Sequence, residues 1–440
     1  MPATDENSVG GVIRQYYDQQ AEREWERLER HRTEFAVTMR ALREHLPHPP
    51  VHVLDCGGGP GRYAIELARA GYTVTLFDLS SENLQLAETK AAEAGVTLAG
   101  YGQGTATDLA RFPDASFDAV LLMGPLYHLL QAEDRRQALA EAYRVLKPGG
   151  LLFAAFISRY AGLRYAAAHE PTFPLEQPAL LESILDTGLL PPRGEDGQVF
   201  VAHFAHPDEV PPMCRQAGFE VQVVLGVEGL VSMIEDEVNA LSGDAWDVWV
   251  DLNYHLAADP SIHGCVEHLL AIAHKPRWRT VLRRIAQRLE EAGVPYKVVG
   301  GTAAALHGVS VRVKDIDIET DAECAYRFQS LFAGYAVQPV TLSETTSYRS
   351  HFGRFDFDGV MVEVMGDLHR REAGHWLPTA ATTESVVDLA GVPVRVSWLE
   401  EEVLAYVRRG RLDRAALCLR RCDHGRLLAL LRGGRTTSVL

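Results

Sequence analysis

Residues 51–61 read Val-His-Val-Leu-Asp-Cys-Gly-Gly-Gly-Pro-Gly, and this stretch decides the fold of the first part of the chain. The apolar, β-branched start predicts a short buried strand. The glycines predict a tight turn in which the backbone can approach a ligand closely. A helical pattern follows over 62–70. A strand, a glycine turn and a helix in this order are typical of α/β folds that bind a ligand at the carboxyl end of the first strand.

The alternation of strands and helices continues along the chain. Further apolar runs occur at 73–79, 97–101, 117–123, 151–157, 220–227 and 267–274. Buried strands that alternate with helices predict a parallel sheet with helices on both faces. Residues 159–265 interrupt the rhythm with several prolines, and we expect them to cover the substrate site. The sequence therefore predicts a Rossmann-like α/β domain over 1–275, with seven mostly parallel strands.

Two acids flank the glycine turn. Asp55 precedes the glycines, and Asp78 ends the second strand, where a carboxylate can accept hydrogen bonds from both hydroxyls of a ribose. The spacing Asp-x-Gly-x-Gly-x-Gly differs from the Gly-x-Gly-x-x-Gly of dinucleotide sites, which accommodates a pyrophosphate. An acid before the glycines suits a ligand with a cationic amino-acid end and no phosphate.

The stretches 53–61, 76–78, 112–120 and 145–150 resemble, in order and spacing, the class I S-adenosylmethionine-dependent methyltransferases, over about residues 10–275. The resemblance implies S-adenosylmethionine as cofactor. The cofactor-binding residues that it implies are Asp55, Gly57, Gly59, Gly61, Asp78, Leu79, Ala106, Thr107, Asp108, Met123 and Tyr17. Where the family usually has an acid-Ala pair for the adenine, this chain has Thr105-Ala106-Thr107-Asp108. The acid is either displaced to Asp108 or replaced by Thr105, and the alternative for Asp108 is a helix N-cap or the acid of a turn.

Residues 123–129 read Met-Gly-Pro-Leu-Tyr-His-Leu and resemble a bacterial subgroup of small-molecule methyltransferases. Tyr127 and His128 are expected near the transferred methyl group, since ligands bind at the carboxyl ends of such strands. His128 is proposed as general base. The alternative is a histidine that only packs and forms hydrogen bonds. Tyr127 is catalytic, lines the adenine or forms part of a lid. Tyr17, in a helix predicted over 12–45, either closes over the cofactor or packs as part of an ordinary helix.

A second motif follows at 298–302, Val-Val-Gly-Gly-Thr, and at 315–318, Asp-Ile-Asp-Ile. Residues two apart on a strand point the same way, so Asp315 and Asp317 present two carboxylates that suit a pair of hard cations. Glu363, on the next predicted strand, is the third proposed metal ligand. The nucleotide-binding residues are Gly300, Gly301 and Thr302, which offer backbone N–H groups to phosphate.

This motif resembles the minimal nucleotidyltransferase fold of the polymerase-beta superfamily, over about residues 280–425. We expect a smaller α+β domain over 280–440 with C-terminal helices, and the resemblance implies magnesium and a nucleoside triphosphate. Where a lysine is usual in that family, Val407 and Arg408 stand instead. The alternative is a non-catalytic binding or oligomerisation module. Residues 275–279 read as a linker between the two domains.

Composition limits the partners. The 440 residues carry a formal charge of −16, which disfavours DNA and RNA as partners and makes an RNA-modifying enzyme a weaker alternative. No apolar run approaches the roughly 20 residues of a membrane span, and residues 1–7 are polar and acidic. We predict a cytoplasmic enzyme that methylates an O or N atom of a small metabolite or natural product. A homodimer is left open.

Overall fold

A computed structural model describes residues 9–190, 200–379 and 384–433 of the chain. These residues fold into two compact units, Met1–Pro276 and Arg277–Leu440. The polar stretch 1–7, and residues 191–199 within the predicted insertion, lie outside the described residues. None of the described helices combines the length and the apolar character that crossing a membrane requires.

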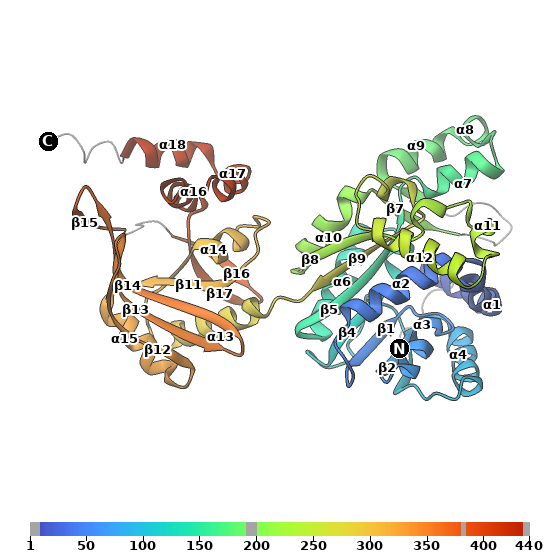
Figure 1. Ribbon diagram of the computed structural model, residues 1–440, viewed down its shortest axis with the longest axis horizontal. Coiled ribbons are helices and arrows are strands. Elements are labelled where there is room, and N and C mark those ends of the chain that lie inside the picture. The colour runs from blue at the N-terminus through green and yellow to red at the C-terminus, as the bar shows by residue number, and fades with distance from the viewer. Residues whose placement is uncertain (1–8, 191–199, 380–383, 434–440) are drawn as a thin grey trace. The chain divides into compact units, whose positions relative to one another are not determined.

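The sheet of the first unit has the strand order β3-β2-β1-β4-β5, continued by β9 and β8 (Figure 1). The strands are β1 (His52–Cys56), β2 (Thr73–Asp78), β3 (Gly100–Gln103), β4 (Phe117–Leu122), β5 (Leu146–Ser158), β8 (Glu220–Gly226) and β9 (His268–His274). The first five strands are parallel, whereas β9 runs antiparallel to β5 and to β8. The predicted Rossmann-like sheet with its seven strands is confirmed.

Two short strands, β6 (Leu189–Leu190) and β7 (Ala202–Ala205), extend this sheet beyond the prediction. The 13-residue strand β5 is long enough for its body to pair with β9 while its last residues, Ile157 and Ser158, pair with β7. The sequence did not reveal this branch because the pairing residues of β7 are few and close to prolines.

Helices cover both faces of the sheet, as the buried residues of two hydrophobic clusters show. One cluster joins the sheet to α2 (Arg32–His45), α3 (Arg62–Arg69) and α4 (Ser81–Glu93), and the other joins it to α6 (Ala132–Val145) and α10 (Val210–Gln216). The helix predicted over 12–45 is two helices, α1 (Val9–Arg30) and α2. The break falls at His31, whose backbone angles, φ −103° and ψ 60°, are not helical.

The predicted insertion is largely helical. Its further helices are α7 (Ala161–His169), α8 (Phe173–Glu176), α9 (Pro178–Thr187), η1 (Pro207–Glu209), η2 (Gly229–Val231), α11 (Glu235–Asn239), α12 (Asp244–Leu256) and η3 (His263–Cys265). Part of it forms a separate cluster in which Phe173, Ile184 and Phe204 are buried, and Tyr127 packs against that cluster. The insertion therefore contacts the segment after β4, where ligands bind in such sheets.

The second unit has a sheet of the order β12-β13-β14-β11-β10-β17-β16, with β15 paired to β14. Its strands are β10 (Lys297–Val299), β11 (Asp315–Thr320), β12 (Ala336–Glu344), β13 (Tyr348–Phe357), β14 (Val360–Glu372), β15 (His375–Pro378), β16 (Glu384–Leu389) and β17 (Val392–Ser397). Its helices are α13 (Arg277–Glu291), α14 (Gly300–Leu306), α15 (Ala322–Leu331), η4 (Ala333–Tyr335), α16 (Leu399–Arg408), α17 (Leu412–Leu419) and α18 (His424–Gly433). The predicted α+β fold of this part is confirmed.

Helix α13 begins three residues earlier than predicted, so the linker predicted over 275–279 is wrong for 277–279. Trp278 is only 6% exposed and belongs to the core of the second unit. A buried tryptophan stabilises the first turn of this helix because it removes a large apolar surface from water. The C-terminal helices α16, α17 and α18 form a second cluster with α14.

Candidate active sites

The glycine loop between β1 and α3 has a left-handed backbone at three positions. Gly57, Gly59 and Gly61 have φ of +73°, +56° and +83°. A Cβ on Gly57 would lie 2.5 Å from Pro125, which follows β4, whereas a Cβ on Gly59 would meet nothing closer than 3.8 Å. The loop therefore presses against the β4 segment at Gly57 and leaves an open surface at Gly59, where a ligand can lie.

Asp55 is a buried carboxylate beneath this loop, and its residue is 1% exposed. Neither oxygen accepts a well-formed hydrogen bond from a described residue. Burial, followed by repulsion from Asp78, raises the pKa of Asp55 to about 7. Buried polar groups are normally paired, so these oxygens suit a polar or cationic group that the chain itself does not provide.

Asp78 ends β2 and ties the loop to the next helix. One oxygen accepts from the backbone N–H of Gly59 at 2.8 Å, and the other from that of Ser80 at 2.9 Å and from Asn83 Nδ2 at 3.2 Å. Burial raises the pKa of Asp78 although these bonds favour its charged form. A carboxylate has about four lone-pair sites, so Asp78 keeps acceptor capacity for a ligand.

The segment predicted to contact adenine forms a compact turn after β3. Ala106 is buried, and the hydroxyls of Thr105 and Thr107 lie 3.0 Å apart. Asp108 is exposed, and its Oδ1 accepts from the backbone N–H of Ala110 at 3.1 Å. The turn-acid alternative for Asp108 therefore agrees with the geometry, because its side chain is occupied by its own turn.

Helix α1 contacts the segments after β4 and after β2 through two side chains. Tyr17 Oη lies 2.6 Å from His128 Nε2, and Ser80 Oγ donates to Asp18 Oδ1 at 2.6 Å. Leu79 and Tyr17 pack on the same small cluster, around Ile13. Tyr17, which was predicted to bind the cofactor, thus lies against His128 after β4. The carbonyl oxygen of Met123, another predicted cofactor-binding residue, accepts a hydrogen bond from Tyr127 Oη at 3.3 Å.

His128 has no free ring nitrogen. Nδ1 lies 2.9 Å from the carbonyl oxygen of Val201, which only accepts, so Nδ1 carries the proton and Nε2 accepts from Tyr17. Burial lowers the pKa of His128 to about 4. These contacts disagree with a general base at His128 and agree with the alternative, a histidine that fixes the position of α1.

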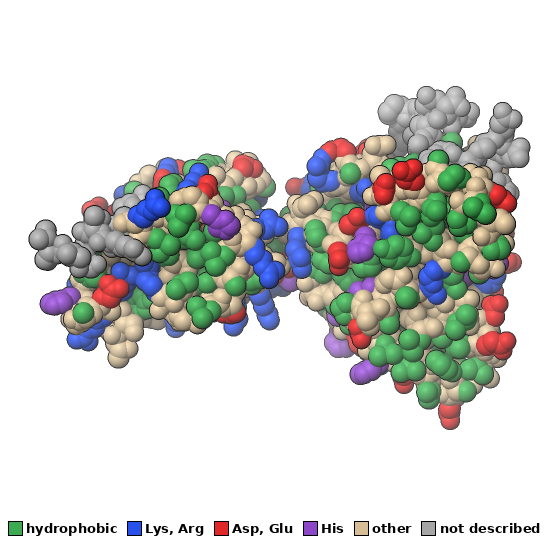
Figure 2. Space-filling view, turned by 90° about the horizontal axis from the view of Figure 1, so that it is seen from above, with side chains coloured by type: hydrophobic (Ala, Val, Ile, Leu, Met, Phe, Trp, Pro, Cys, Tyr) green, Lys and Arg blue, Asp and Glu red, His purple; other side chains and the backbone are tan. Residues whose placement is uncertain are grey.

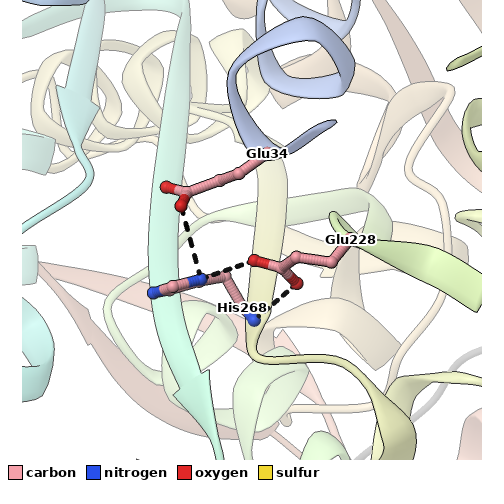
Figure 3. A group of neighbouring side chains, drawn as sticks. All are labelled: Glu34, Glu228 and His268. Atoms are coloured by element: carbon pink, nitrogen blue, oxygen red, sulfur yellow. Dashed lines mark hydrogen bonds and ion pairs between the residues drawn. The ribbon is translucent and has the colours of Figure 1, made fainter. Parts of the chain in front are cut away.

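A cluster that the sequence analysis missed lies near Tyr127. Figure 3 shows Glu34 of α2, Glu228 between β8 and η2, and His268 at the start of β9. Within residues 9–190, 200–379 and 384–433, this is the only group of three or more acidic, histidine or cysteine side chains whose ligand atoms all lie within 4.8 Å of one another. The only local sequence signal is the pair Glu267-His268 before the apolar run 269–273.

In the second unit, β11 and β14 are parallel and place Asp317 directly beside Glu363. Asp315 lies two residues before Asp317 on the same face, as predicted from the period of a strand. Burial, then Asp315 and Glu363, raise the pKa of Asp317 to about 7. Such crowding of buried carboxylates suits a cation, although the three carboxylates are less tightly grouped than the cluster around His268.

The Gly-Gly-Thr segment approaches these acids directly. Gly300 has φ +71°, and a Cβ there would clash with Asp317 Oδ2. Thr302 Oγ1 donates to the carbonyl oxygen of Asp315 at 2.8 Å, and Gly301 continues the first turn of α14. The predicted nucleotide-binding and metal-binding residues therefore lie together at one end of the sheet.

Two charged partners complete this second site. Arg354 Nε donates to Glu363 Oε1 at 2.8 Å. Arg409 donates from Nε to Tyr348 Oη at 3.2 Å, and its charge also acts on Asp317. Val407 and Arg408 stand where the resembling family usually has a lysine. In the structure, the arginine whose charge acts on Asp317 is the next residue, Arg409, which is the C-cap of α16.

Comparisons with known proteins match a different family to each of the two units. The profile of the methyltransferase domain family matches residues 54–154. A ubiquinone biosynthesis O-methyltransferase of Caulobacter vibrioides is 36% identical over 113 residues, which are 26% of this chain and 43% of that protein. The protein of the same description from Pseudomonas savastanoi pv. phaseolicola is 31% identical over 175 residues, 40% of this chain and 67% of that protein.

The first unit belongs to the S-adenosylmethionine-dependent methyltransferases. The methyltransferase unit thus matches from less than half to about two thirds of the length of these relatives. Its glycine loop, Asp55 and Asp78 all lie inside the segment that the family profile matches.

The second unit is nucleotidyltransferase-like. The profile of the aminoglycoside-2''-adenylyltransferase family matches residues 281–417. A solved structure from Thermotoga maritima that is assigned as a nucleotidyltransferase is 37% identical, covers 32% of this chain and 90% of that chain, and superposes with a TM-score of 0.30.

Proposed function

We propose that the methyltransferase unit transfers a methyl group from S-adenosylmethionine to an oxygen or nitrogen atom of a small molecule. The observation that carries this proposal is the unpaired, buried carboxylate of Asp55 beneath a glycine loop that is itself tied to Asp78. S-adenosylmethionine would supply a methyl group on a positively charged sulfur. The relatives named above support a hydroxyl acceptor, since both are described as O-methyltransferases.

Each residue of the site would contact a different part of the cofactor. Asp55 would pair with the ammonium group of the cofactor, because a buried carboxylate needs a cationic or hydrogen-bonding partner. Asp78 would accept hydrogen bonds from the ribose hydroxyls. Tyr17 and Asp18 of α1 close the site and exclude water, which strengthens electrostatic interactions inside it. Methyl transfer is a direct displacement, so positioning of the acceptor supplies much of the rate.

The test of this assignment is binding of S-adenosylhomocysteine to the full chain, measured by isothermal titration calorimetry. Asp78→Asn removes the charge but keeps the shape, and we expect the dissociation constant to rise by about 10-fold to 100-fold, because charge-assisted hydrogen bonds are worth roughly 1.5–3 kcal/mol. Glu82→Gln is the matched control, since Glu82 is an exposed carboxylate in the first turn of α4. Equal binding by Asp78→Asn and by the unmodified chain would contradict the site.

We propose as a second function that the C-terminal unit binds a magnesium-bound nucleoside triphosphate and transfers a nucleotidyl group to a hydroxyl of a small molecule. Support comes from Asp315 and Asp317 on one face of β11, beside Glu363, with the Gly300 turn against them. Two metal ions at such carboxylates would stabilise the attacking and leaving oxygens of the transfer. The matching profile favours an adenylyl group and an amino-sugar acceptor. A non-catalytic module is the alternative outcome.

A further inference from the structure

Both carboxylate oxygens of Glu228 form hydrogen bonds that position His268. Its Oε2 accepts from the backbone N–H groups of Glu267 at 3.1 Å and of His268 at 2.9 Å, and its Oε1 lies 2.6 Å from His268 Nδ1. Because a carboxylate only accepts, Nδ1 carries a proton. Glu228 is 1% exposed, so this arrangement fixes both the tautomer and the orientation of the imidazole ring.

Glu34 approaches the same nitrogen from the other side, at 3.9 Å, and is neutralised by Arg27. Arg27 Nη1 and Nη2 donate to the two oxygens of Glu34 at 2.7 and 2.9 Å. Burial would raise the pKa of Glu34, but Arg27 and then His268 lower it to about 2. A metal ion in this cluster would have to displace the guanidinium and the proton on Nδ1. The contacts therefore describe a site for a proton and not for a metal.

The second nitrogen of His268 is not used by either carboxylate. In Figure 3, Nε2 points away from both carboxylates, and no described residue forms a hydrogen bond with it. His268 pairs with Ile157 near the carboxyl end of β5. Its ring centroid lies 6.4 Å from that of Tyr127, which follows β4. Ligands bind at this edge of the sheet, so Nε2 can reach an acceptor that lies beside Tyr127.

We propose that the imidazolium of His268 binds the anion of an acidic hydroxyl, such as a phenol, on the methyl acceptor through its Nε2–H, and that Glu228 orients the ring. This inference rests on the proposed methyltransferase function. The O–H bond breaks and its proton goes to water, so the oxygen lies as an anion beside the Nε2–H of the imidazolium. The oxygen then takes the methyl group, the electron pair of the broken C–S bond stays on sulfur, and Nε2 keeps its proton.

The charged and titratable groups that face His268 support a hydroxyl acceptor. They are Arg27 of α1, Glu34 of α2, Tyr127 of α5 (Pro125–His128), Glu228 before η2, and Glu267, which precedes His268 in the sequence. Burial opposes protonation of His268, but Glu34 and then Glu228 outweigh it and raise its pKa to about 9. His268 is therefore positively charged near neutral pH and favours the ionised form of a phenol beside it. The same positive ring repels an ammonium group, so the site favours oxygen acceptors over amines.

The experiment uses the full chain saturated with S-adenosylhomocysteine and the chromophoric probe 4-nitrophenol, whose visible absorbance reports its ionised form. It is run about one pH unit below the probe's own pKa. We expect the unmodified chain to bind the probe as an anion, and His268→Gln to bind it at least about tenfold more weakly. His255→Gln, at an exposed histidine of α12, is the matched control.

A second experiment measures the pKa of His268 by NMR titration of isotope-labelled histidines. In Glu228→Gln we expect this pKa to be lower by at least about one unit than in the unmodified chain, since one negative charge is lost.

The outcomes separate the two proposals. If the unmodified chain binds S-adenosylhomocysteine but not the probe, or binds the probe in its neutral form, the role of His268 is overturned. The same holds if the titration of His268 in Glu228→Gln is unchanged. If the chain does not bind S-adenosylhomocysteine, the proposed function itself fails. The measurement on the unmodified chain decides the question even if His268→Gln does not fold.

Discussion

Gly57 and Gly95 share a left-handed backbone, with φ of +73° and +69°, but differ in what surrounds them. A Cβ on Gly57 would meet Pro125 at 2.5 Å, and a Cβ on Gly95 would meet nothing within 4 Å. The pair therefore separates two reasons for a glycine, the conformation of the backbone and close approach to a neighbour.

We expect Gly95→Ala to lower the free energy of unfolding by about 1 kcal/mol, the usual cost of a left-handed backbone for alanine, and to leave cofactor binding unchanged. Gly57→Ala should destabilise by a larger amount and weaken S-adenosylhomocysteine binding at least about tenfold, because the loop must move off Pro125. Thermal unfolding and calorimetry on both variants check this. Equal behaviour of the two variants would show that the contact with Pro125 does not shape the site.

His128 and His268 illustrate what a single residue gains from its partners. His128 faces a carbonyl and a phenol, and burial alone lowers its pKa to about 4. His268 faces Glu34 and Glu228, which raise its pKa to about 9. The motif at 123–129 indicated His128 as the functional histidine. The carboxylates that raise the pKa of His268 come from Glu34 and Glu228, which are 234 and 40 residues before it in the sequence, so only folding brings them together.

At the scale of elements, helix α1 is attached to the site by polar contacts at Tyr17 and Asp18. Nδ1 of His128 donates to Val201, so Nε2 depends on Tyr17 for its only hydrogen bond among the described residues. The helix is therefore coupled to the segment after β2 through Ser80 and, through His128, to the segment before β7.

Tyr17→Phe removes one hydrogen bond and leaves a buried acceptor unpaired, which costs about 1–3 kcal/mol. We expect faster amide exchange across α1 in the full chain, measured by hydrogen-exchange mass spectrometry, together with weaker S-adenosylhomocysteine binding. Tyr165→Phe is the control, because Tyr165 of α7 is 53% exposed. Unchanged exchange in α1 would mean that other contacts hold the helix in place.

For the whole molecule, the acidic excess belongs to one unit. Residues 1–276 contain 39 of the 59 acidic residues but only 20 of the 43 basic ones. Figure 2 agrees, since acidic side chains outnumber basic ones on the face of the first unit that it shows. The methyltransferase unit thus has a formal charge of −19, while the nucleotidyltransferase-like unit is slightly basic, with a formal charge of +3. This suits an anionic nucleotide in the second unit.

Because each unit has its own core and its own site, we expect ligand binding to be separable. In calorimetry on the full chain, Asp315→Asn should abolish magnesium-dependent ATP binding and leave S-adenosylhomocysteine binding within about twofold. Asp78→Asn should weaken S-adenosylhomocysteine binding by the factor given above and leave magnesium-dependent ATP binding within about twofold. Glu323→Gln, at an exposed acid of α15, is the control for the second unit. Absence of magnesium-dependent ATP binding in the unmodified chain would favour the non-catalytic module.

The sequence by itself determined the two folds and the loops at their strand ends, because those features depend on local rules. The strand period placed Asp315 and Asp317 on one face, and the glycine spacing marked the turn after β1. Only the tertiary structure decided which polar and charged side chains lie close enough to form hydrogen bonds or to change one another's pKa. It paired His128 with Tyr17, gave His268 two carboxylates from distant segments and brought Arg409 to Asp317. The reason is physical: backbone conformation follows from neighbours in sequence, whereas a pKa or a hydrogen bond follows from neighbours in space.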